Sequence, residues 1–433
     1  MNRTKCAWLA ALWVAASLIG CAAIEEDLAP PAKDAAAAAP PAVAAPAAVE
    51  APASAAPIAG PVEAPVTTSP EALDIVIQRA GDRLFSDALR VLGDERRDLV
   101  IDPFIDANTG QQTLGSADAG GKLAALVAQR FRQWTVRPFE RKALIGSPLL
   151  LIGTLTPVAL SDAGNGARDA YRLWLTLVDL RSGNIVAKRL DRATLASVNA
   201  EPLQFFRDGP TWHKDPTTLA YVNSCQVQAR VGERADTLYL WRLPAAALLQ
   251  EGIVAYHDKK FTQARRLFVQ ASEIADAEDL RALSGRYLTS WHLAAKDDAA
   301  QELKRIVANG LASKSLPLKV LFQPGTTIML PGADRREQYR QWIREVARQA
   351  NASRQCLSVI GHASRGSAAA ASVELSQRRA ATVRWLLALA APASSSRFTA
   401  HGAGWRDNLI GLGGDDMSDA LDRRIEFRVV DCP

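Results

Sequence analysis

The segment VIGHASRGSAAAASVELSQRRAATV, residues 359–383, carries the strongest structural signal in the sequence. Its apolar start is typical of a buried strand, the Gly-His pair and the small residues after it predict a loop, and the remainder predicts a helix. Leu375, Arg379 and Val383 are spaced by four residues, so they share one face of that helix. We therefore expect Arg379 to point inward, near the start of the helix, toward a loop with almost no acidic residue.

Strand-like and helix-like segments alternate from residue 316 to the end of the chain. The expected order is strand, helix, strand, helix, strand, strand, in the segments LKVLF, QYRQWIREVARQ, CLSVIG, ELSQRRAATVRWLLAL, RFTAHGAG and RRIEFRVV. The motifs VIGHAS, LSQRRAATV, GAG and DRRIEFRV occur in this order, and residues 316–433 resemble the OmpA-like peptidoglycan-binding domain. The resemblance implies a βαβαββ fold that binds the diaminopimelate of the peptidoglycan stem peptide.

The same resemblance implies which residues bind that ligand. In the family, an aspartate at the end of the Gly-His loop binds the ammonium group, and an arginine of the helix binds the carboxylate. The arginine corresponds to Arg379, and we predict that Gly361, His362 and Arg423 belong to the same site. The aspartate is replaced by Ser364, which has no charge, so binding is expected to be weaker or to shift to another anionic group.

Two alternatives remain open at this site. Arg379 could form a structural ion pair with Glu374 or Glu426 instead of binding a ligand. The missing carboxylate could also come from the loop after the GAG motif, which contains three aspartates: Asp407, Asp415 and Asp416.

The start of the chain has the features of a secretory signal peptide over residues 1–20. Arg3 and Lys5 precede an apolar run that is too short to span a bilayer. The run ends in LIGC, which resembles the lipobox of bacterial lipoproteins and implies that Cys21 is acylated, with palmitate among its acyl chains. By the same analogy, Ala22 favours the outer membrane, with the protein facing the periplasm; a chance cysteine after an ordinary signal peptide is the alternative.

Residues 21–70 consist mostly of Ala and Pro and cannot form a core, so they are expected to form a lipidated, semi-extended tether. At roughly 3.1 Å per residue the tether would reach on the order of 150 Å. The formal net charge of +5 is weak and scattered, which excludes nucleic acid as an expected partner.

Residues 71–240 alternate between helix-like and strand-like segments and predict a small α/β domain with a mixed sheet. YRLWLTLVDLRSGNIVAKR (171–189) begins with the period of two that is typical of a strand. Together with IDPFIDANTGQQT (101–113) and LIGTLTPV (151–158), it resembles the periplasmic domains of penicillin-binding-protein activators and of the FlgO and CsgG groups. The resemblance implies an activator or assembly factor without catalytic residues.

Residues 243–312 are expected to be helical. Gly252, Ala264 and Phe268 have the spacing of a tetratricopeptide repeat, in which small residues let two helices approach and an aromatic ring packs across them. Fewer than three repeats are rarely stable alone, so we expect these helices to pack against a neighbouring domain. A plain helical connector is the alternative to a protein-docking surface.

No pattern in the sequence predicts catalysis, a cofactor or a metal site. The stretch from Gly115 to Leu123 is close to a phosphate-binding loop, but its spacing is off by one and Leu123 offers no hydroxyl to magnesium; we expect a flexible entry into a helix. The histidines show no ligand spacing, and His362 is expected to pack at the root of its loop. These histidines are His213, His257, His292, His362 and His401.

Three cysteines remain after the signal peptide and the lipidation site. Cys356 opens one predicted strand and Cys432 closes another, so we favour a disulfide between them if the strands are antiparallel neighbours. Cys225 is then an unpaired and buried thiol.

The sequence as a whole favours a multidomain α/β (α+β) protein of the bacterial cell envelope. The leading hypothesis is a lipoprotein of the outer membrane that binds peptidoglycan non-covalently and presents an adaptor surface to other envelope proteins. The alternative is an activator or assembly factor for a peptidoglycan synthase or a secretion or appendage machine, acting through residues 71–240.

Overall fold

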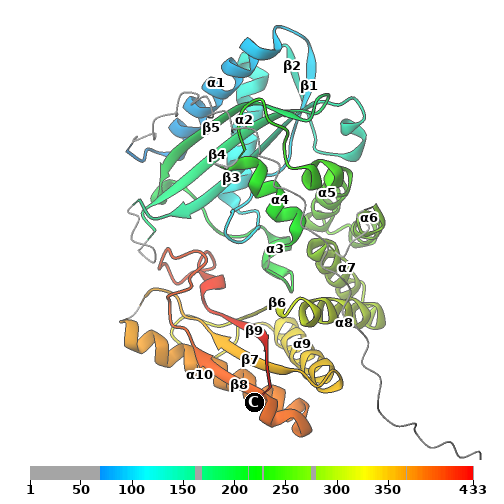
Figure 1. Cartoon of the computed structure of the whole chain (residues 1–433), viewed down its shortest axis with the longest axis vertical. Coiled ribbons are helices and arrows are strands. Elements are labelled where there is room, and N and C mark those ends of the chain that lie inside the picture. Colours follow the sequence, from blue (N-terminus) through cyan, green and yellow to red (C-terminus); the bar gives the residue numbers. More distant parts are fainter. Residues whose placement is uncertain are drawn as a thin grey trace, which may run out of the picture. The chain divides into compact units, whose positions relative to one another are not determined.

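The computed structural model describes residues 69–160, 168–212, 214–226, 229–274, 279–366 and 368–432. Two β-sheets with packed helices are separated along the sequence by a run of helices (Figure 1). The fold is therefore mixed α/β with two mixed sheets, which confirms the predicted fold class. The predicted signal peptide, Cys21 and the tether lie outside the described residues.

The first sheet has five strands in the order β2-β1-β3-β4-β5. Strand β1 runs parallel to β2 and β3, and the remaining neighbours are antiparallel. The strands are β1 (Arg97–Ile101), β2 (Trp134–Arg137), β3 (Leu149–Val158), β4 (Ala170–Asp179) and β5 (Asn184–Thr194).

Helices cover both faces of this sheet, and the central strand β3 is buried on both sides. Leu149 and Leu151 belong to an apolar cluster with α1 and α2. Leu150 and Ile152, which alternate with them, belong to a second cluster with α4 and α5. The covering helices are α1 (Leu73–Leu92), α2 (Leu114–Arg130), α4 (Pro216–Cys225) and α5 (Thr237–His257).

Helix α2 begins earlier than the sequence predicts. The hydroxyl of Thr113 accepts a hydrogen bond from the N–H of Ser116 (3.1 Å), and the Ser116 hydroxyl accepts one from the N–H of Thr113 (2.9 Å). This capping box stabilises the first turn, so the helix begins at Leu114. The expected flexible entry was therefore wrong: residues 115–122 are helical.

Four helices follow the first sheet: α5, α6 (Phe261–Ile274), α7 (Leu280–His292) and α8 (Lys296–Ala312). Phe268 of α6 packs against two glycines, because a Cβ on Gly252 of α5 would lie 2.8 Å from its ring and a Cβ on Gly285 of α7 would lie 2.5 Å from it. Because neither glycine has a side chain, helices α5, α6 and α7 can pack around the ring of Phe268. The resemblance to a tetratricopeptide repeat stays a prediction.

Helix α5 runs without interruption through the boundary that we expected between residues 240 and 243. Its first half, with Tyr239 and Leu243, belongs to the core beneath the first sheet. Its second half, with Leu249 and Ile253, belongs to the next core along the chain. A single helix therefore contributes to both cores.

The second sheet has four strands in the order β6-β9-β7-β8, in which β7 and β8 are parallel and the other neighbours are antiparallel. Helix α9 joins β6 to β7, and α10 joins β7 to β8, which gives the predicted βαβαββ order. The elements are β6 (Ser315–Leu321), α9 (Ala333–Ala352), β7 (Cys356–Gly361), α10 (Ala369–Ala390), β8 (Phe398–Gly402) and β9 (Arg424–Val430). Shorter helical turns are α3 (Gln204–Asp208), η1 (Arg141–Leu144), η2 (Leu195–Ser197), η3 (Pro392–Arg397) and η4 (Ala420–Asp422).

The helical segment packs against this second sheet and α9, as we expected from its small number of repeats. Helix α8 contacts both β6 and α9. The buried indole N–H of Trp342 in α9 donates a hydrogen bond to the hydroxyl of Tyr287 in α7 (2.9 Å). One apolar cluster consequently extends from α5–α8 into the C-terminal domain.

Two cations of the C-terminal domain bind the end of α3. The Lys319 ammonium donates to the carbonyl of Phe206, and Arg335 donates to the carbonyl of Asp208 (2.9 Å). The last carbonyls of a helix have no partner within the helix, so these bonds satisfy them.

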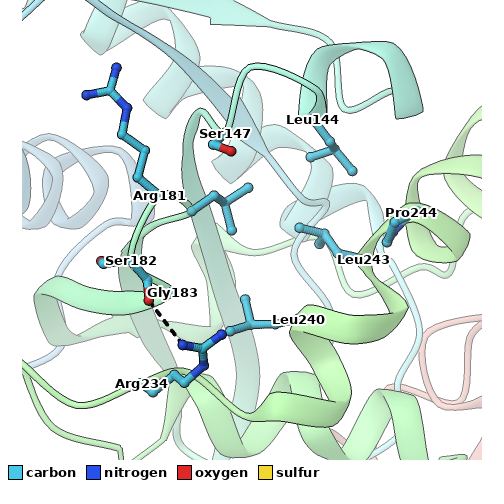
Figure 2. A pocket seen from close by; sticks show the side chains of 10 residues that line it. Leu144, Ser147, Arg181, Ser182, Gly183, Arg234, Leu240, Leu243 and Pro244 are labelled. Carbon is cyan, nitrogen blue, oxygen red and sulfur yellow. Dashed lines mark hydrogen bonds between the residues drawn. The ribbon is translucent and has the colours of Figure 1, made fainter.

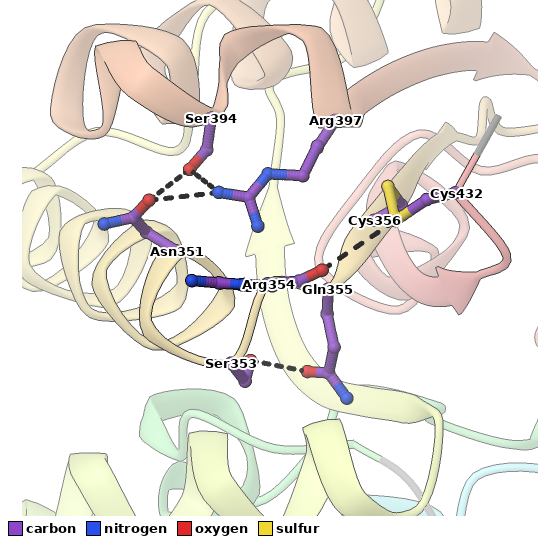
Figure 3. The surroundings of a disulfide bond; sticks show 8 residues. All are labelled: Asn351, Ser353, Arg354, Gln355, Cys356, Ser394, Arg397 and Cys432. Atoms are coloured by element: carbon purple, nitrogen blue, oxygen red, sulfur yellow. Dashed lines mark hydrogen bonds between the residues drawn. A yellow bond between two sulfur atoms is a disulfide. The ribbon is translucent and has the colours of Figure 1, made fainter.

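Cys356 and Cys432 form a disulfide with a Cα–Cα distance of 5.2 Å (Figure 3). Cys356 opens β7 and lies opposite Val430 of the antiparallel strand β9, which brings the two cysteines together. Cys225 at the end of α4 is free and buried, and burial raises the pKa of its thiol. Among the described residues, no helix combines the length and apolarity needed to cross a bilayer.

Candidate functional site

The predicted ligand loop begins where β7 passes beneath α10. A Cβ on Gly361 would lie 2.0 Å from the carbonyl oxygen of Ser376 in α10, and a Cβ on the paired Gly402 of β8 would lie 2.5 Å from the N–H of Gln377. The two glycines therefore let the helix lie directly on the sheet. Gly361 thus positions the loop, and its contact with a ligand stays a prediction.

Arg379 is fully buried and donates to three backbone carbonyls. Its Nε atom donates to Thr326 (2.8 Å), one terminal nitrogen to His362 (2.9 Å) and the other to Gln323 (2.9 Å). The guanidinium also lies over the ring of Phe322, 5.2 Å from its centroid. Arg379 thus joins the segment after β6 to the loop after β7.

The predicted contact of Arg379 with an external carboxylate stays a prediction. The side chain has no exposed surface in this structure, so an anion could reach it only after the loops open. Arg379 was expected near the start of its helix, but α10 begins at Ala369, so Arg379 lies beyond the first turn, in which the helix dipole acts.

Arg379 does not form an ion pair with Glu374 or Glu426, the two alternatives considered. Glu374 lies 3.5 Å from the neighbouring Arg378 on the exposed face of α10. Glu426 pairs with Arg424 and Arg428 on its own strand. Backbone carbonyls have no side-chain signature, which explains why the sequence did not indicate the observed partners.

Arg423 is a second buried cation, and it binds the same segment. It donates to the carbonyl of Phe322 (3.2 Å) and to the carbonyl of Asp416 (2.7 Å), and it lies 3.4 Å from the carboxylate of Asp415. Burial and, to a smaller extent, the nearby Arg423 lower the pKa of Arg379, and Asp415 partly opposes them, so that it lies at about 10.

Asp415 supplies a carboxylate at the position where Ser364 replaces the aspartate of the family. The Ser364 hydroxyl donates a hydrogen bond to Oδ1 of Asp415. Ser364 is buried, whereas the Asp415 side chain is 40% exposed. Of the three aspartates considered, Asp407 and Asp416 instead use their carbonyls to bind Arg424 and Arg423.

Two buried aspartates hold the loop that carries Asp415. The Asp422 carboxylate accepts the N–H groups of Leu409, Ile410 and Gly411, and the Asp419 carboxylate accepts those of Leu412 and Gly414. Burial raises the pKa of both carboxyls, that of Asp422 to about 6, and these N–H groups oppose the shift. The binding of loop N–H groups by these aspartates was not predicted, although Asp422 begins the DRRIEFRV motif.

The loop after β7 also contains a cation, Arg365, that was not among the predicted site residues. The guanidinium of Arg365 lies over the ring of Trp405, 5.1 Å from its centroid. One terminal nitrogen of Arg365 and the indole nitrogen of Trp405 are buried without a hydrogen-bond partner among the described residues. Arg365 follows Ser364 directly in the loop after β7, whereas Asp415 belongs to the loop after β8.

His362 is fully buried and serves the packing of the loop. Its Nε2 atom lies 3.4 Å from the Glu426 carboxylate. Burial, together with Arg424 and Arg428, lowers the pKa of His362 to about 3, and Glu426 partly opposes the shift. The ring is therefore neutral at pH 7.

The sequence predicted no metal site and no ligand role for the remaining histidines. No group of three or more potential ligands gathers in the part of the chain that the structure describes. His257 and His292 bond to Phe205 and Tyr256, and His213 lies outside the described residues.

A hollow of about 340 Å³ lies at one edge of the first sheet and does not contribute to this site (Figure 2). Arg181 at its rim pairs with Glu95 (2.8 Å), and Arg234 donates to the carbonyl of Ser182 (3.3 Å). Both cations are thus engaged, and we assign no ligand to the hollow. Its apolar lining consists of Leu144, Leu180, Leu240, Leu243 and Pro244.

Residues 321–416 match the OmpA family. This is less than half of the chain, and it shows that the C-terminal domain is OmpA-like. No curated protein matches the chain.

Three solved structures illustrate the similarity of parts of the chain to other proteins. The peptidoglycan-associated lipoprotein from Burkholderia pseudomallei is 20% identical over 26% of this chain and 89% of its own, with a TM-score of 0.23. The OmpA-like domain of FopA1 from Francisella tularensis subsp. tularensis SCHU S4 is 21% identical over 27% of this chain and 75% of its own, with a TM-score of 0.21. The LpoB C-terminal domain from Escherichia coli is 14% identical over 28% of this chain and 98% of its own, with a TM-score of 0.21.

The contacts of Arg379 predict a large loss of stability when it is replaced. Arg379→Ala leaves three buried carbonyls without their donor and should lower the free energy of unfolding by about 2–4 kcal/mol in urea titrations. Arg378→Ala, the matched control, removes an exposed side chain and should change it by less than about 0.5 kcal/mol. Equal effects of the two substitutions would contradict the structural role of Arg379.

The environment of His362 predicts a loss of stability in acid. Its folded-state pKa of about 3 lies below the ordinary value of 6.5, so the unfolded chain takes up a proton first as the pH falls. The stability that neutral His362 contributes is complete above pH 6.5 and should fall by about 2 kcal/mol between pH 6.5 and pH 5.

Urea titrations of the wild type and of His362→Gln at both pH values isolate this contribution. The difference between the two proteins removes the effect of other buried groups that titrate in this range. A pH dependence that is identical in both proteins would disprove the assignment.

Proposed function

We propose that the protein is a lipoprotein of the cell envelope, anchored in the outer membrane and facing the periplasm, that binds peptidoglycan non-covalently through its OmpA-like domain. In this proposal it acts as a structural or adaptor protein, without catalytic activity and without a cofactor. The part of peptidoglycan that it binds is the stem peptide with its diaminopimelate.

The observation that carries the proposal is the position of Asp415. The domain that matches the OmpA family has lost the loop aspartate, yet an exposed carboxylate from another loop lies at the replacing serine, Ser364. An ammonium group is a ligand that such a carboxylate would bind through a charge-assisted hydrogen bond. The chemistry that the family resemblance implies for this loop is thereby retained through a different residue.

The burial of Arg379 changes where the ligand is expected to bind. The two buried arginines, Arg379 and Arg423, hold the loops, so a ligand would contact the exposed surface around Gly366 and Asp415. Gly361 and His362 support this surface from beneath.

The anchor and the adaptor role rest on the sequence. The lipobox at Cys21 supports attachment to the outer membrane, and the Ala- and Pro-rich tether is long enough to let the folded domains reach the cell wall. The helices of residues 243–312 would present the adaptor surface. Val254 of α5, whose side chain is half exposed, marks the outer face of these helices.

The proposed function predicts that the full-length protein, extracted in detergent, sediments with purified peptidoglycan sacculi. Free meso-diaminopimelate should displace it, whereas lysine, which has the same two ammonium groups but one carboxylate fewer, should displace it roughly tenfold less well if the lost contact is charge-assisted. The sedimented fraction is measured by quantitative immunoblotting. Protein that stays in the supernatant without competitor would overturn the proposal.

The anchor and the adaptor surface can be tested together in cells. A photo-crosslinker at Val254 should form a defined adduct with an envelope protein, and the adduct should be absent for a crosslinker at Val91, a more exposed position on α1. Cys21→Ala should remove the lipid and release the protein from the membrane fraction. Membrane retention of this variant would contradict the anchor, and an adduct from Val91 alone would favour the activator role of the first domain.

A further inference from the structure

A turn of the first domain (residues 71–240) contacts the loop after β8, which carries Asp415. The side-chain amide of Asn108 in this turn donates a hydrogen bond to the carbonyl of Leu409 (3.1 Å). The N–H of the same Leu409 donates to the buried carboxylate of Asp422 in the C-terminal domain (2.7 Å). The loop backbone is therefore held at one residue by both domains.

The turn itself is fixed by bonds within the first domain. Asp106 is buried, and its carboxylate accepts the N–H of Asn108 (3.0 Å) and the hydroxyl of Thr109 (2.8 Å), which is the geometry of an Asx turn. The carbonyl of Ala107 accepts the ammonium of Lys214 (2.9 Å). Because the backbone of Asn108 is already ordered, its side chain loses little further freedom when it binds the loop.

Two more residues of the loop lie against the first domain. Gly411 is buried, and a Cβ at this position would lie 3.2 Å from Cγ of Arg168, which comes just before β4. Leu412 packs on the core between α1, α2 and the first sheet, and also on the apolar cluster around Ile410 and Leu421. The contact is thus apolar as well as polar, and it involves three residues of the loop.

A short segment before α4 forms a second connection between the two domains. Thr211 pairs with Leu318 of the edge strand β6. The guanidinium of Arg424 lies over the ring of Trp212, 5.0 Å from its centroid, and donates to the carbonyl of Asp407 (3.1 Å). Residues of the first domain are in this way bound near the beginning and in the middle of the same loop.

We propose that the first domain positions the Asp415 loop through Asn108, so that the state of the 106–111 turn and ligand binding by the C-terminal domain are coupled. The inference rests on the proposed function and adds a regulation to it. Asn108 is a positioning residue, because it acts on a ligand through the loop and not by contact. Coupling of this kind is reciprocal: a turn that releases the loop weakens binding, and a bound ligand stabilises the turn.

Hydrogen exchange of the full-length protein in detergent, measured by mass spectrometry, reports how often the loop opens. Asn108→Ala removes the donor and should speed exchange of the amides of residues 409–414 by about two- to tenfold, the factor expected for one neutral hydrogen bond. Asn108→Gln keeps a side-chain amide and should exchange more slowly than Asn108→Ala. Asn223→Ala, at an exposed position on α4 of the same domain, should leave this exchange unchanged.

Binding measurements separate positioning from a merely structural role. Asn108→Ala should bind purified sacculi about two- to tenfold more weakly than wild type in sedimentation, and Asn223→Ala should bind as wild type does. Soluble muropeptides should slow exchange in residues 103–111 of wild type and leave it unchanged in Asn108→Ala. A role confined to the stability of the first domain would not transmit protection from a ligand on the other domain.

The outcomes distinguish this inference from the function on which it rests. Unchanged exchange at residues 409–414 in Asn108→Ala overturns the inference, whether or not the protein binds sacculi. Exchange that rises by the same factor in β3 and in the loop shows general destabilisation and overturns it too. If wild type binds sacculi and muropeptides do not protect residues 103–111, the coupling fails while the proposed function stands. If wild type does not bind sacculi, the proposed function and the coupling both fall.

Discussion

The C-terminal site depends on two buried guanidinium groups that bind backbone carbonyls. Arg379 reaches from α10 to the segment after β6 and to the loop after β7, and Arg423 reaches the same segment and the loop that carries Asp415. A buried cation is stable when its donors are satisfied, and carbonyl oxygens do this without adding a competing charge. Three separate stretches of chain are in this way fixed around one centre.

The surface chemistry follows from this internal arrangement. Both arginines are used to hold loops, whereas the Asp415 side chain is 40% exposed. Asp419 and Asp422 complete the arrangement by accepting N–H groups of the loop that carries Asp415. Buried acids and buried bases thus each hold backbone.

The sequence predicted the elements of the C-terminal domain because its apolar periodicity records which faces are buried, as in Leu375 and Val383 of α10. It could not predict the partners of Arg379, because backbone carbonyls of distant loops leave no pattern in the side chains. Asp415 was one of three candidate aspartates, and only the folded loop brings it to Ser364, 51 residues away in the chain. Helix α5 crosses the boundary expected near residue 240, because it continues through Pro244 and shares its two halves between two cores.

The disulfide between Cys356 and Cys432 gives the site a dependence on compartment. The two cysteines are 76 residues apart, and the covalent ring that they close contains Ser364, Arg365, Asp415 and Arg423. Closing a loop of this length restricts the unfolded chain and is worth about 4 kcal/mol in the chain-entropy model. In a reducing cytoplasm the chain would lack this restraint, and it would gain it only on reaching an oxidising space. The domain would therefore reach its full stability only in an oxidising compartment. The charged residues of the site lie within the ring that the disulfide closes.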